Sequence, residues 1–189
     1  WRRNYLNEKL KFWRRDTIEE LAKKMISLGG TMDYTTANSF SQSFKNAFIP
    51  IKKRSRNALK VARWLQERAM VKYPGLLFHP QHELACRQMV DEDGNKNFGC
   101  IIYFDLSGDE QRAREFAKAV ASTKKIMLAV SLAAPGTIIT HVWTMIFGNL
   151  DPFERKKLGI SPTAFRLSVG LQPVEEICEA LACGFSAIK

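Results

Sequence analysis

The stretch Phe165-Arg166-Leu167-Ser168-Val169-Gly170 carries one arginine in an otherwise apolar, strand-like run. In an extended strand the apolar side chains at 165, 167 and 169 share one face, and Arg166 and Ser168 lie on the other. If that second face lines a cleft, the planar guanidinium of Arg166 is suited to binding a carboxylate through two parallel hydrogen bonds. The alternative is an arginine exposed on a half-solvated sheet, and the strand alone favours that alternative.

Four further motifs accompany this run: Tyr73-Pro74-Gly75-Leu76, His79-Pro80-Gln81-His82, Ala129-Val130-Ser131-Leu132 and Pro173-Val174-Glu175-Glu176. In this order the five motifs resemble the C-terminal part of the pyridoxal-phosphate enzymes of cysteine and methionine metabolism. This trans-sulfuration family contains the cystathionine synthases and lyases, methionine gamma-lyase and the homoserine sulfhydrylases. The resemblance covers nearly all of the chain from about Leu21 to Ile188.

The spacing of apolar residues predicts the secondary structure. Helices are expected over 16–29, 109–122 and 173–187, with a longer helical stretch over 35–70 that is broken at Pro50. The resemblance implies another short helix over 81–89. Strands are expected over 98–106, 126–130 and 165–170, and residues 137–159 are expected to be irregular except for a basic turn at 155–157. Strands separated by helices indicate a sheet covered by helices on one face.

The predicted fold class is therefore α/β (α+β). The resemblance implies a mainly antiparallel sheet with helices on one face, as in the small domain of fold-type-I pyridoxal-phosphate enzymes, preceded by a long broken helix. We expect three parts: a basic aromatic arm over 1–15, a helical linker region over 16–70 and the small domain over 71–189.

The charge of the chain is strongly positive, with 29 Lys and Arg against 19 Asp and Glu in 189 residues. Six of these basic residues lie in the arm among aromatic residues, a pattern that permits binding to RNA or to an acidic protein. A solvated charged face is the ordinary alternative. The six residues are Arg2, Arg3, Lys9, Lys11, Arg14 and Arg15.

The sequence also argues against several classes of protein. No apolar run reaches the roughly 18 residues that a membrane span needs, so we expect no membrane partner. Four cysteines without C-x-x-C spacing indicate reduced core residues and an intracellular protein, cytoplasmic or mitochondrial. The histidines do not form a metal-binding or triad pattern, so no catalytic residue and no metal ligand is assigned. The cysteines are Cys86, Cys100, Cys178 and Cys183, and the histidines are His79, His82 and His141.

The resemblance assigns substrate-binding roles to two residues. Arg166 matches the arginine that binds the α-carboxylate of the amino-acid substrate in the family. Ser131 matches a residue whose backbone or hydroxyl helps to orient that carboxylate. For Ser131, a satisfied hydroxyl at the end of a strand is the alternative.

Pyridoxal phosphate chemistry needs a lysine that forms an internal aldimine, an acid paired with the pyridine nitrogen, and a phosphate cradle. In the resembling family these groups lie in a large domain N-terminal to everything matched here, so the resemblance assigns no cofactor-binding residue to this chain. We expect pyridoxal phosphate to bind only when a partner large domain is present, and no cofactor to bind the isolated chain.

Two hypotheses follow from this resemblance. In the first, the chain is the C-terminal part of a C–S lyase or gamma-replacement enzyme and acts with a cofactor-domain chain or homologous subunits. In the second, it is a catalytically inactive homologue that serves as a structural subunit of a larger assembly, with RNA as one candidate component. Departures from the family support the second hypothesis: where the family reads Ser-Leu-Gly-Gly, this sequence has Ser131-Leu132-Ala133-Ala134.

Overall fold

The arginine-containing run forms β5 (Ala164–Ser168), which is the central strand of a five-stranded sheet. The computed structural model describes residues 15–29, 32–45 and 47–189. Its contacts divide the chain into two compact units, Trp1–Asn46 and Ala47–Lys189. The sheet belongs to the second unit.

The sheet has the strand order β1-β2-β5-β4-β3. All neighbouring strands are antiparallel except β3 and β4, which are parallel. The expected mainly antiparallel sheet is confirmed. The other four strands are β1 (Met70–Lys72), β2 (Ile101–Asp105), β3 (Met127–Leu128) and β4 (Ile138–His141).

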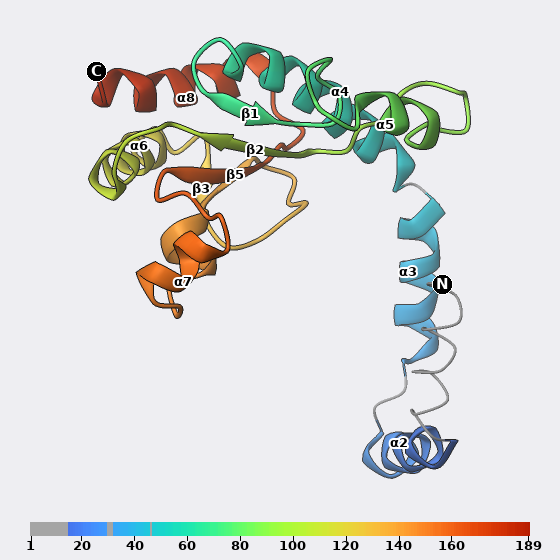
Figure 1. Ribbon diagram of the computed structural model, residues 1–189. Coiled ribbons are helices and arrows are strands. Elements are labelled where there is room, and N and C mark those ends of the chain that lie inside the picture. Colours follow the sequence, from blue (N-terminus) through green and yellow to red (C-terminus); the bar gives the residue numbers. More distant parts are fainter. Residues whose placement is uncertain (1–14, 30–31, 46) are drawn as a thin grey trace. The chain divides into compact units, whose positions relative to one another are not determined.

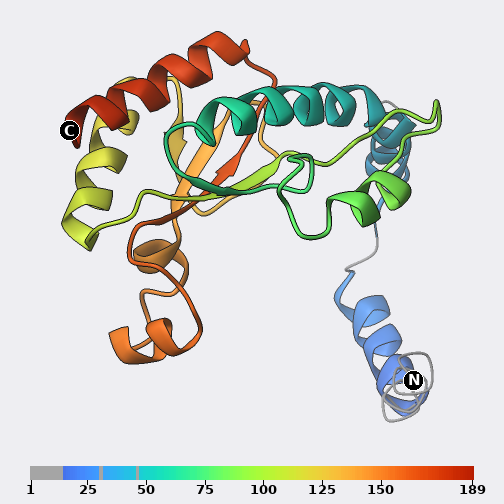
Figure 2. The ribbon, with the colours of Figure 1, turned by 45° about the horizontal axis from the view of Figure 1, so that its top comes forward.

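Three helices, α4 (Phe48–Leu65), α6 (Glu110–Ser122) and α8 (Val174–Ala187), cover one face of this sheet (Figures 1 and 2). The alternation of β5 places Phe165 and Leu167 on that face, where both are fully buried. The ring of Phe116 in α6 lies 5.2 Å from that of Phe165, between centroids, and joins helix to strand. A sheet with helices on one face was expected, and the structure confirms it.

Local sequence explains where α6 begins and why α8 packs closely against it. The carboxylate of Asp109 accepts a hydrogen bond of 2.9 Å from the backbone N–H of Arg112 and so caps the first turn of α6. The expected buried face of α6, at positions 113, 116, 117 and 120, is confirmed. On α8, a Cβ at Gly184 would lie 2.6 Å from Val120 and 2.7 Å from Phe116, so only glycine permits this approach.

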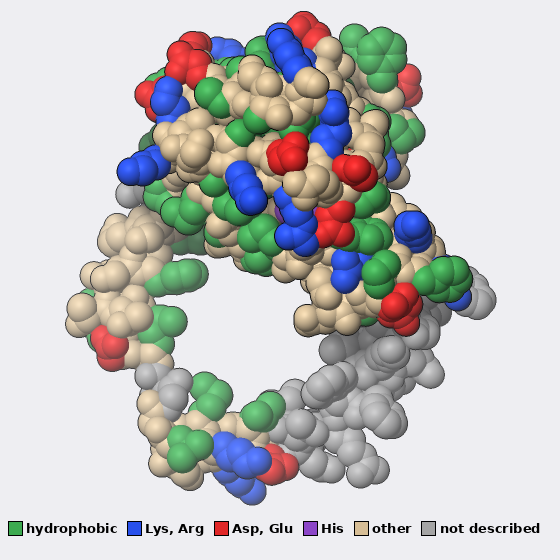
Figure 3. Space-filling model, turned by 90° about the vertical axis from the view of Figure 1, so that its left-hand side faces the viewer, with side chains coloured by type: hydrophobic (Ala, Val, Ile, Leu, Met, Phe, Trp, Pro, Cys, Tyr) green, Lys and Arg blue, Asp and Glu red, His purple; other side chains and the backbone are tan. Residues whose placement is uncertain are grey.

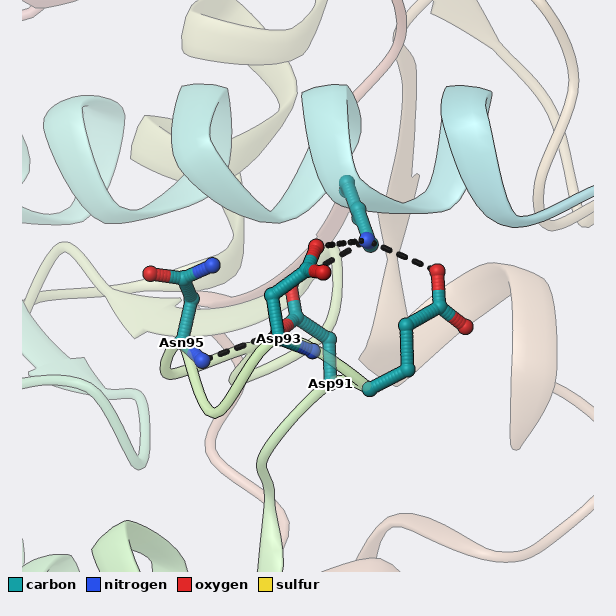
Figure 4. A network of polar contacts seen from close by, with 5 residues as sticks. Asp91, Asp93 and Asn95 are labelled. Atoms are coloured by element: carbon teal, nitrogen blue, oxygen red, sulfur yellow. Dashed lines mark hydrogen bonds and ion pairs between the residues drawn. The ribbon is translucent and has the colours of Figure 1, made fainter.

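Helix α4 is tied to the loop before β2 by a group of ion pairs (Figure 4). The ammonium of Lys52 lies 2.8 Å from Asp93, 2.9 Å from Glu92 and 3.6 Å from Asp91. These acids, Asp93 foremost, raise the pKa of Lys52 above its ordinary value. Asp91 in turn accepts hydrogen bonds from the backbone N–H groups of Asp93 and Asn95, which fixes the turn of the loop.

The first unit contains α2 (Arg15–Leu28) and α3 (Tyr34–Lys45). Asp33 caps α3, since its carboxylate accepts hydrogen bonds from the backbone N–H and the hydroxyl of Thr36. Both helices leave apolar side chains exposed, among them Ile26 and Phe40. The basic arm was expected over 1–15, and its residues 1–14 lie outside those that the structure describes.

The structure corrects the expected helix break. Pro50 does not interrupt the helix: it lies in the first turn of α4, where a missing N–H is tolerated. The interruption lies between the end of α3 at Lys45 and the start of α4 at Phe48. The expected domain limits of 1–15, 16–70 and 71–189 stay a prediction, but α4 packs into the core of the second unit through Ala58 and Leu65.

The structure also corrects the expectation for 137–159, which is not irregular. It contains β4, the π-helix η1 (Val142–Ile146) and α7 (Pro152–Lys157), whose N-cap Asp151 forms a capping box with Glu154.

Strand β1 was not predicted. Cys183 is exposed and therefore not a core residue as expected, whereas the other three cysteines are half-buried; all four are free.

Candidate functional site

Arg166 lies on the sheet face opposite α4, α6 and α8, in a row of side chains that runs across four strands. Its direct cross-strand partners are Tyr103 on β2 and Thr140 on β4, and Lys72 on β1 is opposite Tyr103. Residues directly opposite one another point to the same face of a sheet. The ammonium of Lys72 lies 5.3 Å from the centroid of the Tyr103 ring, and burial raises the pKa of the Tyr103 hydroxyl.

The guanidinium of Arg166 is half-buried and held on one side only. Its Nη2 donates hydrogen bonds to Thr140 Oγ1 at 3.1 Å and to the backbone carbonyl of Ser131 at 3.3 Å. Its Nε is buried and has no hydrogen-bond partner. A buried, unsatisfied donor costs about 1–3 kcal/mol, and one carboxylate oxygen would satisfy it. The arginine is therefore anchored through Nη2, while Nε keeps a donor that is not used.

The structure brings the two predicted site residues together, but Ser131 contributes its carbonyl oxygen. A carbonyl can only accept, so Ser131 orients Arg166 and does not itself bind a carboxylate through this atom. The Ser131 side chain is exposed. Sequence reasoning missed Thr140, whose fully buried hydroxyl also donates to Ala129 O at 2.6 Å. The β-branched run Ile138-Ile139-Thr140 was the signal that could have indicated a strand here.

The loop between β3 and β4, which carries Ser131, is fastened to the end of β5. Ser168 Oγ accepts a hydrogen bond of 3.0 Å from the Ala133 N–H, and the Gly170 N–H donates to Thr137 Oγ1 at 3.0 Å. A Cβ at Gly170 would lie 2.5 Å from the backbone of Gly136, so the loop can lie this close only against a glycine. On the other side, Asn57 of α4 donates to the Gly170 carbonyl at 3.1 Å.

The donors on this face fit a carboxylate better than they fit a whole cofactor. The acidic side chain among the described strand residues of this face is that of Asp105, which accepts hydrogen bonds from Ser107 N and Thr163 Oγ1. Its carboxylate is therefore already bonded to the loops beside it. Lys72 lies over the Tyr103 ring. The chemistry that this row offers is anion binding by a guanidinium.

The profile of the family described as "Cys/Met metabolism PLP-dependent enzyme" matches residues 11–186. The chain belongs to this family. It is 29% identical over 178 residues to O-succinylhomoserine sulfhydrylase of Pseudomonas aeruginosa, covering 93% of this chain and 42% of that protein. It is 33% identical over 175 residues to cystathionine gamma-lyase of Rattus norvegicus, with 91% and 42% covered. The family uses pyridoxal phosphate, and the expected membership is confirmed.

Solved structures agree with the sequence relatives. The crystal structure of cystathionine gamma synthase from Xanthomonas oryzae pv. oryzae in complex with cystathionine matches with a TM-score of 0.62 and 31% identity. The match covers 74% of this chain and 35% of that chain. This family member therefore spans about two fifths of the length of the curated relatives that it matches.

The histidines that the sequence left without a catalytic role have structural partners. His141 Nε2 is 2.8 Å from the carbonyl of Pro162 and its Nδ1 is 2.8 Å from Thr144 Oγ1. Burial lowers the pKa of His141.

Within the described ranges, no group of three or more His, Cys, Asp or Glu is placed to hold a metal ion. No described helix is both long and apolar enough to cross a membrane.

Proposed function

We propose that this chain is the substrate-carboxylate-binding, C-terminal part of an enzyme that acts on sulfur-containing amino acids. The reaction is a C–S lyase or gamma-replacement reaction, and a separate chain or subunit carries the cofactor domain. Family membership supports the reaction class. The names of the relatives support the substrate class, since they include cystathionine gamma-synthase and L-methionine gamma-lyase.

The observation that carries the proposal is the unsatisfied, buried Nε of Arg166. Nη2 is held by Thr140 and Ser131, so the guanidinium is fixed before any ligand arrives. A preorganised donor loses little conformational freedom on binding, and the pair that it forms with a carboxylate is charge-assisted and directional. Arg166 would therefore position the α-carboxylate and, through it, the rest of the amino acid.

Pyridoxal phosphate would supply the electron sink for the bond-breaking steps once it is bound. The residues beside Arg166 do not provide a complete site for it, so we assign the cofactor to the partner. This chain contributes the orientation of the substrate. The expected partners, a cofactor-domain chain or homologous subunits, remain part of the proposal.

The first test is direct binding. Cystathionine is titrated into the full chain while the Arg166 Nε–H signal is followed by proton–nitrogen correlation spectroscopy. The signal is expected to move because this N–H gains a partner. Arg166→Lys abolishes the signal, and Arg56→Ala, on the exposed side of α4, is the matched control that leaves it in place. An Arg166 signal that does not move at saturating cystathionine contradicts the proposal.

The second test joins the chain to the cofactor-binding large domain of Escherichia coli cystathionine gamma-synthase. In this hybrid, Arg166→Ala is expected to raise KM and to lower kcat/KM by the equivalent of about 2–4 kcal/mol. Arg166→Lys restores only part of this, because an ammonium does not reproduce the two-pronged contact of a guanidinium. The isolated chain is expected to show neither an aldimine absorbance band nor turnover. An active hybrid in which Arg166→Ala and Arg166→Lys leave KM and kcat/KM unchanged would contradict the role of Arg166.

A second candidate function is that of a catalytically inactive structural subunit. It is favoured by the loop that carries Ser131, where Ala133 adopts a left-handed backbone with φ of 58° and where the resembling family reads glycine. The RNA or acidic-protein partner proposed for the basic arm belongs to this candidate. On the face shown in Figure 3, Lys and Arg side chains stand among Asp and Glu side chains. An assembly purified with this chain that lacks the aldimine absorbance band would favour the structural subunit.

A further inference from the structure

A cavity of about 810 Å³ lies between α4, the loop after β1 and α5 (His82–Gln88), and none of the residues that hold Arg166 line it. Small-molecule sites typically have volumes of about 300–1,000 Å³. Its apolar lining includes Trp64, Phe78 and Phe98. Phe78 is 93% exposed, so an aromatic ring stands at the solvent side of the cavity.

A cysteine and a histidine face each other in this cavity. His82 and Cys86 are four residues apart on α5 and therefore share one face of the helix. The Cys86 sulfur lies 3.4 Å from His82 Nε2. His82 Nδ1 lies 2.8 Å from the Pro74 carbonyl. A carbonyl can only accept, so Nδ1 carries the proton and Nε2 presents its lone pair to the thiol.

This is the arrangement of an activated nucleophile: a thiol, a base within hydrogen-bonding reach, and a third group that orients the base. The Phe98 ring, 5.8 Å from the imidazole between centroids, packs beside it. Both Cys86 and His82 are half-buried and thus reachable from the cavity. The pair belongs to α5, which the resemblance implied only as a short helix and to which no chemical role was assigned.

The charged groups on the cavity wall favour an anionic occupant. Arg63 and Lys96 line it, and Lys96 donates a hydrogen bond to the backbone carbonyl of Cys86. Glu67 is the opposing acid. With the aromatic lining, these two cations select a small molecule that has a negative charge and an apolar body.

We propose that Cys86 is a nucleophilic thiol that undergoes thiol–disulfide exchange with small anionic disulfides bound in this cavity. His82 Nε2 takes the proton of the thiol, and the thiolate attacks one sulfur of the disulfide. The disulfide bond of the ligand breaks as the bond to the Cys86 sulfur forms, and the other half leaves as a thiolate. Cys86 is oxidised and the leaving sulfur is reduced, so the step needs no further reagent. The imidazolium then returns its proton to solvent.

Two other cysteines of the same chain serve as internal references. Cys183 on α8 is exposed, so it reports the reactivity of an accessible thiol outside this cavity. Cys178, also on α8, is half-buried, and burial raises the pKa of its thiol to about 11. Reactivity that followed exposure alone would rank Cys183 above Cys86.

The experiment uses the full chain with two probes, the dianionic aromatic disulfide dithiobis(nitrobenzoate) and the dicationic disulfide cystamine. Modification rates at each cysteine are measured by peptide mass spectrometry. Cys86 is expected to react with dithiobis(nitrobenzoate) about tenfold faster than Cys183, and to lose most of this advantage with cystamine. Equal rates at Cys86 and Cys183 with the anionic probe would overturn the proposal.

Variants separate the effect of the His82 base from the effect of the positive charges of Arg63 and Lys96. His82→Gln is expected to lower the Cys86 rate about tenfold while the Cys183 rate stays the same. Lys96→Met combined with Arg63→Met is expected to remove the preference for the anionic probe. The Cys183 rate and circular dichroism check that each variant is folded. If His82→Gln does not fold, the wild-type chain in denaturant replaces it: the ratio of the two rates must fall to about one, and a ratio that persists in the unfolded chain contradicts the role of the cavity.

Discussion

Arg166 and Thr140 face each other directly across the β4–β5 pair, and the guanidinium Nη2 lies 3.1 Å from the threonine hydroxyl. The same hydroxyl donates to the carbonyl of Ala129 at 2.6 Å. One buried oxygen therefore accepts from the arginine and donates to the loop that carries Ser131. The Thr140 side chain consequently contributes both to the orientation of the guanidinium and to the position of the loop.

Replacing this hydroxyl tests that arrangement. Thr140→Val keeps the shape but leaves Arg166 Nη2 and Ala129 O each short of a partner, so the free energy of unfolding is expected to fall by about 1–3 kcal/mol in urea. Thr140→Ser keeps the oxygen and loses a methyl group, at a cost of about 0.8 kcal/mol. The Arg166 Nε–H signal is expected to shift or broaden in the valine variant only. The arrangement is contradicted if valine and serine give the same spectrum.

The close approach at Gly170 provides a second prediction. Gly170→Ala places a Cβ 2.5–2.7 Å from the backbone at 135–137, where no flexible side chain can yield, so the expected loss is about 1–3 kcal/mol. Gly136→Ala is the matched control, because a Cβ there meets nothing within 4 Å, and its effect is expected to stay within about 0.5 kcal/mol. Equal midpoints of chemical denaturation for the two variants would show that the loop moves away freely.

Backbone strain at Ala133 gives the third prediction. A non-glycine residue with φ of 58° is disfavoured, so Ala133→Gly is expected to raise the free energy of unfolding by about 0.5–1 kcal/mol. Ala134→Gly, at the next position and without a positive φ, is expected to lower it by a similar amount because glycine has more freedom in the unfolded chain. Denaturant titrations of the two variants should therefore move in opposite directions, and movement in the same direction speaks against strain at Ala133.

The fourth prediction concerns pH. Burial lowers the pKa of His141, so the folded chain keeps this side chain neutral while the unfolded chain binds a proton below pH 6.5. Above pH 6.5 the contribution of His141 to the free energy of unfolding is expected to be constant. Below pH 6.5 the free energy of unfolding is expected to fall as the pH drops toward the pKa of His141 in the folded chain. His141→Gln should flatten this slope in denaturation curves. A His141 ring signal that titrates at or above pH 6.5 in the folded protein would contradict the prediction.

Patterns with a strong period predicted the fold correctly. The alternation around Arg166 placed β5, and the apolar spacing of α6 gave its buried face residue by residue. Strand β4 escaped because all four of its residues are buried, including a threonine and a histidine that satisfy their polar groups internally. Alternation of polar and apolar residues is lost when both faces of a strand are covered.

The candidate site was predicted only in part, for a similar reason. Arg166 stands out in an apolar strand, but the strand alone favoured an exposed arginine, and the resemblance to the family assigned its carboxylate-binding role. The anchor at Thr140 and the carbonyl contribution of Ser131 depend on strand register and on the path of the loop, which residue types do not encode. The His82–Cys86 pair depends on the Pro74 carbonyl, a backbone atom that is not visible in the residue types of the sequence.

The central strand of this sheet is the last to be synthesised. β5 lies between β2 and β4, so until residues 164–168 have been made the sheet exists only as two separate strand pairs, β1–β2 and β3–β4. Two-stranded pieces are marginal in water, and long-range pairing is slow to form. Nascent chains of this protein would therefore hold the aromatic core around Phe165 open until β5 has left the ribosome. A premature stop shortly before Ala164 removes the strand that joins the two halves of the sheet.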